Sequence, residues 1–230
     1  MTTRPVPTTR PAPAATTTTT TAVTARPVAP AAAGTYLYDT AGQATVGALV
    51  TPFPSVTSLV VDQPAGARQR STRDLRDPAG AGPVFETVLE YRPDGAHLVS
   101  LRLTATVLLL TQTVELRPSS PELLVPTGAA PGDRREIDVS VAGGGTARLV
   151  VEVVGEEVVT VGGQAVAATV VRLSGSVPGQ LDARLDLTVW LDPTRGLWVK
   201  ERAVAEASSG DGGLRYTSQY EATLQRLTPG

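Results

Sequence analysis

The chain has 230 residues, of which 41% are hydrophobic and 18% charged, and its formal net charge is −2. This balance leaves no basic surplus to neutralise phosphates, so we expect no nucleic-acid partner. The absence of cysteine excludes disulfides, thiolate metal sites and cysteine nucleophiles. No apolar run reaches the roughly 18–20 residues that a membrane-spanning helix needs, and residues 1–34 show no signal peptide.

Residues 1–34 form a low-complexity tail of threonine, proline and alanine. The tail has no large apolar side chain, so it cannot bury enough surface to offset the entropy of ordering. We therefore predict a disordered linker, which its prolines bias toward extended polyproline II structure. Thr/Pro-rich stalks are typical spacers through a cell wall, so we expect an extracytoplasmic envelope protein. The folded domain is predicted to occupy residues 35–228.

From Tyr36 onward, apolar and polar residues alternate with a period of two, which predicts β-strands. The clearest example is LDARLDLTVWLD at 181–192, where every second residue is apolar. The segment 214–224 repeats this pattern. Further strands are predicted at 35–39, 44–50, 56–62, 67–75, 84–91, 97–103, 105–116, 134–141, 146–159, 164–175 and 197–207.

Turn signals separate these strands. Gly162-Gly163 lies between two β-branched runs and predicts a two-residue hairpin. DPTRG at 192–196 predicts another hairpin, in which Gly196 takes a positive φ. PSSPELLV at 118–125 is compatible with a single helical turn, and no longer helix is predicted. Because the connections are short, we predict one large, curved antiparallel sheet or open barrel of meander topology, with a two-sheet sandwich as the alternative.

Both tryptophans of the chain flank the DPTRG turn. In a symmetric hairpin Trp190 pairs with Trp198 across the strands, on the face that also carries charged residues. A register clamp with arginine stacked over the rings explains this pair. A binding surface for a sugar, a lipid or a protein partner is the alternative.

The run VLLL at 107–110 is apolar on both faces of its predicted strand, and so is VVEVV at 150–154. Such a strand packs against a second sheet on one side, or turns that side toward an apolar ligand. The candidate ligand-binding residues are therefore Leu108 and Leu110, together with Trp190 and Trp198.

The titratable residues give weaker signals. His97 is the only histidine and lies in phase with apolar residues, so we interpret it as structural. We find no G-x-S-x-G motif and no imidazole cluster, and we expect no serine triad, metal site or cofactor. Asp182, Asp186 and Glu157 are candidates for a carboxylate pair, although solvated strand faces explain them equally. The arginine-rich segment 68–77 predicts a charge-protected sheet edge, with a partner surface as the alternative.

The second half contains PGDRREIDVSV, VTVGGQAVAATVVRLSG, WLDPTRGLWVKERAV and YTSQYEATLQRL in this order. Over roughly residues 128–227 this arrangement resembles secreted actinobacterial-type β-sheet proteins of unknown function. More distantly, it resembles the half-barrel lipoprotein carriers of bacterial envelopes (LolA-, LolB- and LppX-like). The resemblance implies an envelope location and an apolar ligand in the concave face of the sheet. It implies no catalytic residues, and the helices that cover the opening in those carriers are not predicted here.

Together these observations predict a non-enzymatic, monomeric envelope protein. Its concave sheet face is expected to bind an apolar or amphiphilic molecule, such as a lipid or glycolipid, or an envelope protein. Two alternatives stay open. One is a carboxylate-based hydrolase, and the other is a purely structural module with a fully packed core.

Overall fold

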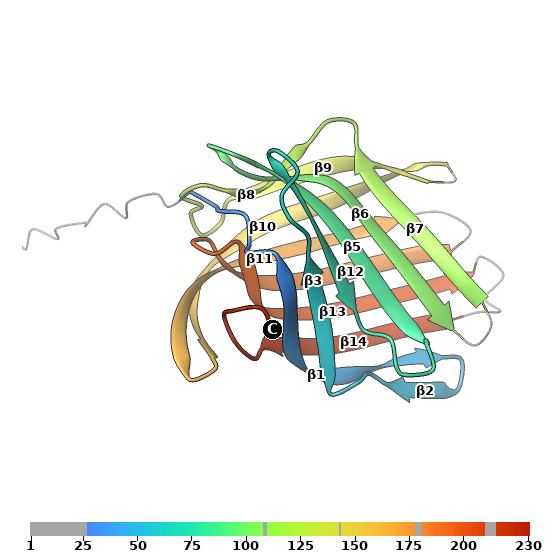
Figure 1. The fold of residues 1–230 in the computed structure, drawn as a ribbon. Helices are drawn as coiled ribbons and strands as arrows, with labels where there is room; N and C mark the ends of the chain where they lie inside the picture. Colours follow the sequence, from blue (N-terminus) through green and yellow to red (C-terminus); the bar gives the residue numbers. More distant parts are fainter. Residues whose placement is uncertain (1–26, 108–109, 143, 178–180, 210–214) are drawn as a thin grey trace, which may run out of the picture.

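The structure, a computed structural model, describes residues 27–107, 110–142, 144–177, 181–209 and 215–230. Within these ranges the chain forms β-strands joined by turns and loops (Figure 1). In chain order the strands are β1 (Gly34–Val46), β2 (Leu49–Pro52), β3 (Val56–Val61), β4 (Arg68–Asp74), β5 (Gly82–Arg92), β6 (Gly95–Val107), β7 (Leu110–Pro118), β8 (Glu122–Pro126), β9 (Arg134–Val141), β10 (Thr146–Val161), β11 (Gln164–Val177), β12 (Leu181–Asp192), β13 (Leu197–Ser209) and β14 (Arg215–Leu224).

Antiparallel pairing between consecutive strands organises the sheet. Consecutive strands pair from β3 through to β7, and again from β9 through to β14, as short connections favour. β7 joins β9 through residues 116–118 and 139–141. β1 pairs with β14 along one stretch and with β3 along another, so it links the two ends of the sheet into a ring. The predicted all-β antiparallel meander is therefore confirmed.

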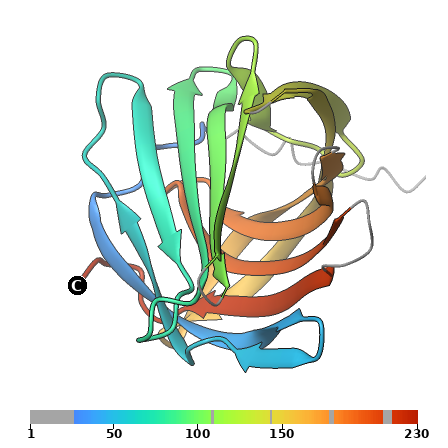
Figure 2. The same ribbon diagram turned by 90° about the vertical axis from the view of Figure 1, so that its right-hand side faces the viewer.

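Two halves of this ring face each other. Strands β3–β7 cross strands β10–β14 in Figure 1, and Figure 2 shows the halves from the side. Because side chains alternate along a strand, every second residue of each half points inward. The buried side chains form two clusters, one containing Tyr38 and Leu197 and the other containing Ile137, Leu149 and Val171. The curved sheet thus encloses a core between its own two halves.

The hairpin glycines adopt the predicted conformation. Gly162 and Gly163 have φ angles of 54° and 80°. They connect β10 to β11, where Val161 pairs with Gln164. Gly196 has a φ angle of 60° in the turn between β12 and β13. Both turns therefore rely on the positive φ that glycine reaches without steric cost.

The helical turn predicted at 118–125 is wrong. Residues 122–126 form β8, which pairs with β6 through Ala96 and Val125. Leu124 and Val125 are buried in the core. Tertiary pairing and burial of these side chains override the weak local preference.

The sheet edge predicted at 68–77 is also wrong, because β4 pairs with β3 on one side and with β5 on the other. The alternation of its side chains explains the misreading. Arg68 and Arg70 are exposed and paired with acidic neighbours, whereas Gln69 and Arg73 are buried. One strand thus carries solvated charges on one face and interior polar groups on the other.

The segment 27–33, which the sequence assigns to the linker, packs on the domain. Val28 and Ala31 are buried. The Ala29 amide donates a hydrogen bond to the Pro193 carbonyl at 3.0 Å. The structure therefore moves the start of the packed domain from residue 35 back to Val28.

Candidate functional site

Three small cavities lie between the two halves of the sheet. Their volumes are about 20, 30 and 30 Å³. Each is about the size that holds one water molecule. Trp198 lines all three, so its indole forms a wall that they share.

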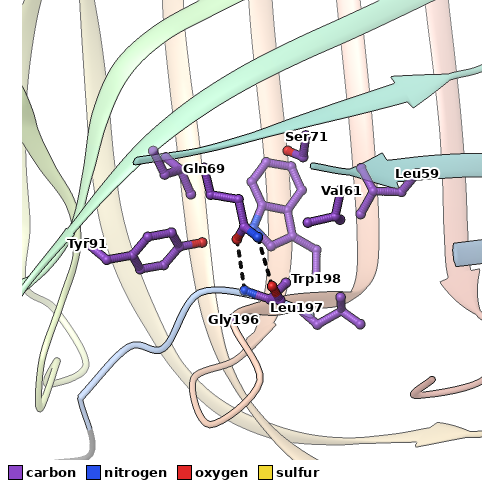
Figure 3. Close-up of a pocket in the computed structure, with 10 residues that line it drawn as sticks. Leu59, Val61, Gln69, Ser71, Tyr91, Gly196, Leu197 and Trp198 are labelled. Carbon is purple, nitrogen blue, oxygen red and sulfur yellow. Dashed lines mark hydrogen bonds between the residues drawn. The ribbon is translucent and has the colours of Figure 1, made fainter. Parts of the chain in front are cut away.

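The first cavity lies where the segment 27–33 crosses the ring (Figure 3). The side chain of Gln69 holds this segment by accepting from the Ala31 amide at 2.9 Å and donating to its carbonyl at 2.8 Å. Figure 3 shows the Trp198 indole beside Gln69 and Val61. Ala31 of the amino-terminal segment thus forms part of the wall of this cavity.

A β-bulge turns Trp198 inward. In the β12–β13 register Trp190 pairs with Lys200 and Leu191 pairs with Trp198, so Val199 is an extra residue on β13. Such a bulge shifts the side-chain alternation of one strand relative to its partner. The predicted pairing of Trp190 with Trp198 is therefore wrong, because the hairpin is not symmetric.

Trp190 has a different environment from Trp198. It lies next to Leu191 on β12, so its side chain points to the opposite sheet face. Its Nε1 donates to a Glu157 carboxylate oxygen at 2.7 Å. The Lys200 ammonium, rather than an arginine, lies 4.9 Å from the ring centroid. Trp190 is nevertheless buried, because it packs in the core cluster that contains Tyr38 and Leu197, and it does not line the three cavities.

The other two candidate residues, Leu108 and Leu110, stay predictions, because their side chains lie outside the described part of the chain. Leu108 lies outside the described residues. Leu110 begins β7 and pairs with Val107 of β6. Of the candidates whose side chains are described, Trp198 alone lines the cavities.

A buried ion pair borders the second cavity. Arg73 of β4 and Glu201 of β13 approach to 2.7 Å between Nε and Oε1, and each side chain is only 4% exposed. The Arg73 guanidinium lies over the Tyr38 ring, with Cζ 3.8 Å from its centroid. Tyr220 hydrogen bonds to Glu201. The pair therefore connects the two halves of the sheet through the interior.

Burial sets the protonation of this cluster. Removal from water raises the pKa of Glu201, and the positive charge of Arg73 opposes this rise. Burial likewise raises the pKa of Tyr38 and of Tyr220, so both hydroxyls stay protonated. The two phenols act as hydrogen-bond donors, and Tyr38 donates to the Trp198 carbonyl at 2.5 Å.

The guanidinium of Arg73 is under-satisfied. Nη1 and Nη2 are buried and have no hydrogen-bond acceptor among the described protein atoms. The Nε–Oε1 contact is an ion pair whose alignment falls short of a hydrogen bond. Buried donors without acceptors are rare, and each one costs free energy. An interior donor group is therefore available to an additional oxygen atom.

Sequence reasoning missed this pair, although a signal was present. Glu201 occupies an inward position between Val199 and Ala203. Arg73 is in phase with Gln69 on β4. A charged residue on the apolar phase of a strand needs a buried partner. The sequence does not show that the two strands face each other.

The interior becomes more accessible toward one end of the ring. Along β12 the inward residue Val189 is buried, whereas Leu187 and Leu185 are half-buried. Phe85 and Leu103 on the opposite half are also half-buried. Figure 2 shows how the two halves of the sheet are arranged around the interior. Leu185, Leu187 and Phe85 also line the second cavity, so apolar side chains extend from the ion pair to a half-exposed wall.

The acidic residues proposed for hydrolysis are not brought together at these cavities. Asp186 is paired with Arg172. Glu157 accepts the hydrogen bond from Trp190. Asp182 is exposed. None of the three lines the cavities described above.

His97 is buried on β6, between its neighbouring strands β5 and β8. Its Nε2 lies 2.9 Å from Asp94 Oδ1, and its Nδ1 lies 3.4 Å from the Pro121 carbonyl. The hydrogen bond to His97 lowers the pKa of Asp94. Within the described residues no group of three histidine or acidic side chains is placed to hold a metal ion. These contacts give His97 the structural position that its sequence phase predicts.

No helix in the described part of the chain has the length and apolarity required to cross a bilayer.

Comparisons with known proteins give only weak structural likenesses. No protein-family model matches the sequence, and no curated protein matches it. The chain is similar to a Bacteroides fragilis protein that is inferred to be exported and has a YmcC-like fold, with a TM-score of 0.42 and 14% identity, covering 88% of this chain and 99% of that one. It is also similar to the hypothetical lipoprotein YmcC from Escherichia coli K12, with a TM-score of 0.33 and 13% identity, covering 85% and 86%. Because both TM-scores are low, we draw no conclusion about function or location from them.

Proposed function

We propose that this chain is a non-enzymatic, extracytoplasmic binding protein that holds an apolar or amphiphilic molecule between the two halves of its sheet. The observation that carries this proposal is the apolar wall of Phe85, Leu185 and Leu187. These side chains are only half-buried, and they line a cavity that Trp198 separates from two others. Ligand sites in proteins are mostly apolar, with a few polar groups that fix orientation.

Entry of a ligand requires side chains to move. Each cavity holds about one water molecule, so none accommodates a chain-length molecule in this conformation. Rotation of the Trp198 indole would merge the three spaces. Trp198 is only half-buried, and the wall beside it is not tightly enclosed. A well-packed core residue would resist such a rotation.

The amino-terminal tail supports the extracytoplasmic part of the proposal. Residues 1–26, which precede the packed segment, have the Thr/Pro/Ala composition typical of stalks outside the cytoplasm. A stalk of this kind would hold the β-domain away from a membrane or cell-wall surface.

The test uses the full chain and the fluorescent apolar probe N-phenyl-1-naphthylamine, whose emission rises in an apolar environment. We expect saturable binding and displacement of the probe by hexadecane delivered as a cyclodextrin complex. Leu185→Gln should weaken probe binding by at least about tenfold, because it places an amide on the apolar wall. Val204→Gln is the matched control, since Val204 is an exposed residue of neighbouring strand β13. The absence of saturable probe binding, or an equal effect of the two variants, would contradict the proposal.

A further inference from the structure

We propose that the Arg73 guanidinium is the recognition element for the polar end of the ligand, and that this end is an uncharged carbonyl group, as in an ester or amide. This inference rests on the proposed function and adds the chemical class of the ligand. It begins from the second cavity, where Arg73 and Glu201 are the only charged residues in an otherwise mostly apolar lining.

The need for an acceptor comes from the geometry of Arg73. One face of its guanidinium is covered by the Tyr38 ring, and its Nε faces Glu201. Nη1 and Nη2 are buried and have no acceptor among the described protein atoms. A carbonyl oxygen accepts two hydrogen bonds in the plane of its group, which suits the planar fork of an arginine. A ligand carbonyl would therefore satisfy donors that the protein leaves unpaired.

The charge of the cluster selects against an anionic ligand. Glu201 lies 2.7 Å from Arg73, and both side chains are 4% exposed. The interior pair is therefore already neutralised. A second carboxylate or a phosphate would place a surplus negative charge beside Glu201 in a medium of low dielectric constant, which is strongly unfavourable. An uncharged carbonyl adds an acceptor without adding charge.

The surrounding side chains define the rest of the ligand. Leu59, Leu101 and Leu185 line the same cavity as the ion pair. Leu187 and Trp198 line both this cavity and the one beneath β8. An apolar chain attached to the carbonyl would therefore run from Arg73 along these two cavities once Trp198 has moved. Burial of this chain would supply affinity, and Arg73 would supply specificity.

The experiment compares three probes with sixteen-carbon chains, each delivered as a cyclodextrin complex at pH 8. These are hexadecane, methyl hexadecanoate and the hexadecanoate anion, and each displaces N-phenyl-1-naphthylamine from the full chain. We expect the ester to bind at least about tenfold more tightly than the hydrocarbon, because it completes a charge-assisted hydrogen bond. The anion should bind no more tightly than the hydrocarbon.

Variants assign this preference to the ion pair. Arg73→Met alone leaves Glu201 buried without its partner, so the double variant Arg73→Met/Glu201→Leu serves as a second test. We expect both to bind hexadecane as the wild type does and to lose the advantage of the ester. Arg70→Met is the control, because Arg70 is exposed on the other face of β4. It should retain the full preference.

The possible results distinguish a failure of this inference from a failure of the proposed function. Equal affinity for ester and hydrocarbon in the wild type would overturn the inference while leaving apolar binding intact, and it would assign the Arg73 donors to water. Tightest binding of the anion would also overturn it. Failure of all three probes to bind would overturn the proposed function, and this inference with it. An ester preference that survives in the double variant would show that Arg73 is not the recognition element.

Discussion

Arg73 and Glu201 meet in the interior of the ring, 2.7 Å apart between Nε and Oε1, and they connect strand β4 of one half with strand β13 of the other. Each of these side chains is costly to bury alone. Together they contact Tyr38 and Tyr220, so the two halves of the sheet share one polar cluster in an apolar surrounding. This cluster bridges the two halves of the sheet through the interior.

Breaking the ion pair should destabilise the fold. We expect Arg73→Met to lower the free energy of unfolding by about 3–5 kcal/mol, because it leaves a buried carboxylate without its partner. The double variant Arg73→Met/Glu201→Leu should unfold close to the wild type, since paired apolar replacement removes both desolvation costs. Urea unfolding followed by circular dichroism measures both. A single variant no less stable than the exposed control Arg70→Met would contradict this account of the pair.

Stability should depend on pH through Glu201. Burial raises the pKa of Glu201 in the folded state above its value in the unfolded chain. The folded state therefore keeps the proton on Glu201 at pH values where the unfolded chain has released it. The contribution of Glu201 to stability is present below about pH 4.5 and is lost as pH rises through the folded pKa. As the pH rises through this range, the free energy of unfolding of the wild type should fall relative to that of Glu201→Gln. A difference that is constant between pH 4 and pH 8 would show that Glu201 has no raised pKa.

Gly196 should be difficult to replace, because two constraints meet there. Its φ angle is 60°, and a Cβ atom added to it would lie 1.9 Å from the Ala29 carbonyl oxygen. Gly163 has a φ angle of 80° but no heavy atom within 4 Å of an added Cβ. Its replacement by alanine therefore measures the cost of the positive φ alone. We expect Gly163→Ala to cost about 1–2 kcal/mol and Gly196→Ala to cost more. Thermal unfolding compares them, and equal losses would mean that the segment 27–33 does not pack against the turn.

The strands were largely predictable from the sequence, because alternation and turn glycines are local properties. The run at 181–192 and the glycine pair at 162–163 both led to the observed strands and turns. The pattern also indicated which residues lie on the same face of a strand. These signals depend on neighbours within a few positions, and they correspond to β10–β14 closely.

The site depended on relationships that local patterns do not contain. The bulge at Val199 moves Trp198 to the interior, and no local pattern reveals it. To predict the contact between Arg73 and Glu201, one must know which strands face each other across the ring. Likewise, Val28 and Ala31 are buried in a segment that forms hydrogen bonds with Gln69 and Pro193, which are distant in the sequence. Its composition alone favours a linker.

Trp190 should contribute to stability but not to ligand binding. Its Nε1 donates to Glu157, and it does not line the three cavities. We expect Trp190→Phe to lower the free energy of unfolding by about 0.5–1.5 kcal/mol through loss of this hydrogen bond. Glu157→Gln keeps an acceptor oxygen and should cost less. Affinity for N-phenyl-1-naphthylamine should be unchanged in both variants. A large loss of affinity in Trp190→Phe would show that Trp190 belongs to the binding site.

The central claim is that an apolar molecule enters the space beside Trp198. The Trp190→Phe variant of the full chain tests this claim most directly, because Trp198 is then its only tryptophan. Its fluorescence is recorded while hexadecane is added as a cyclodextrin complex, with empty cyclodextrin as the blank. We predict a saturable change in the intensity and wavelength of Trp198 emission, and a much weaker response when Leu185→Gln is added. Emission that stays unchanged up to the solubility limit of the complex would contradict a ligand-binding interior and favour a structural module.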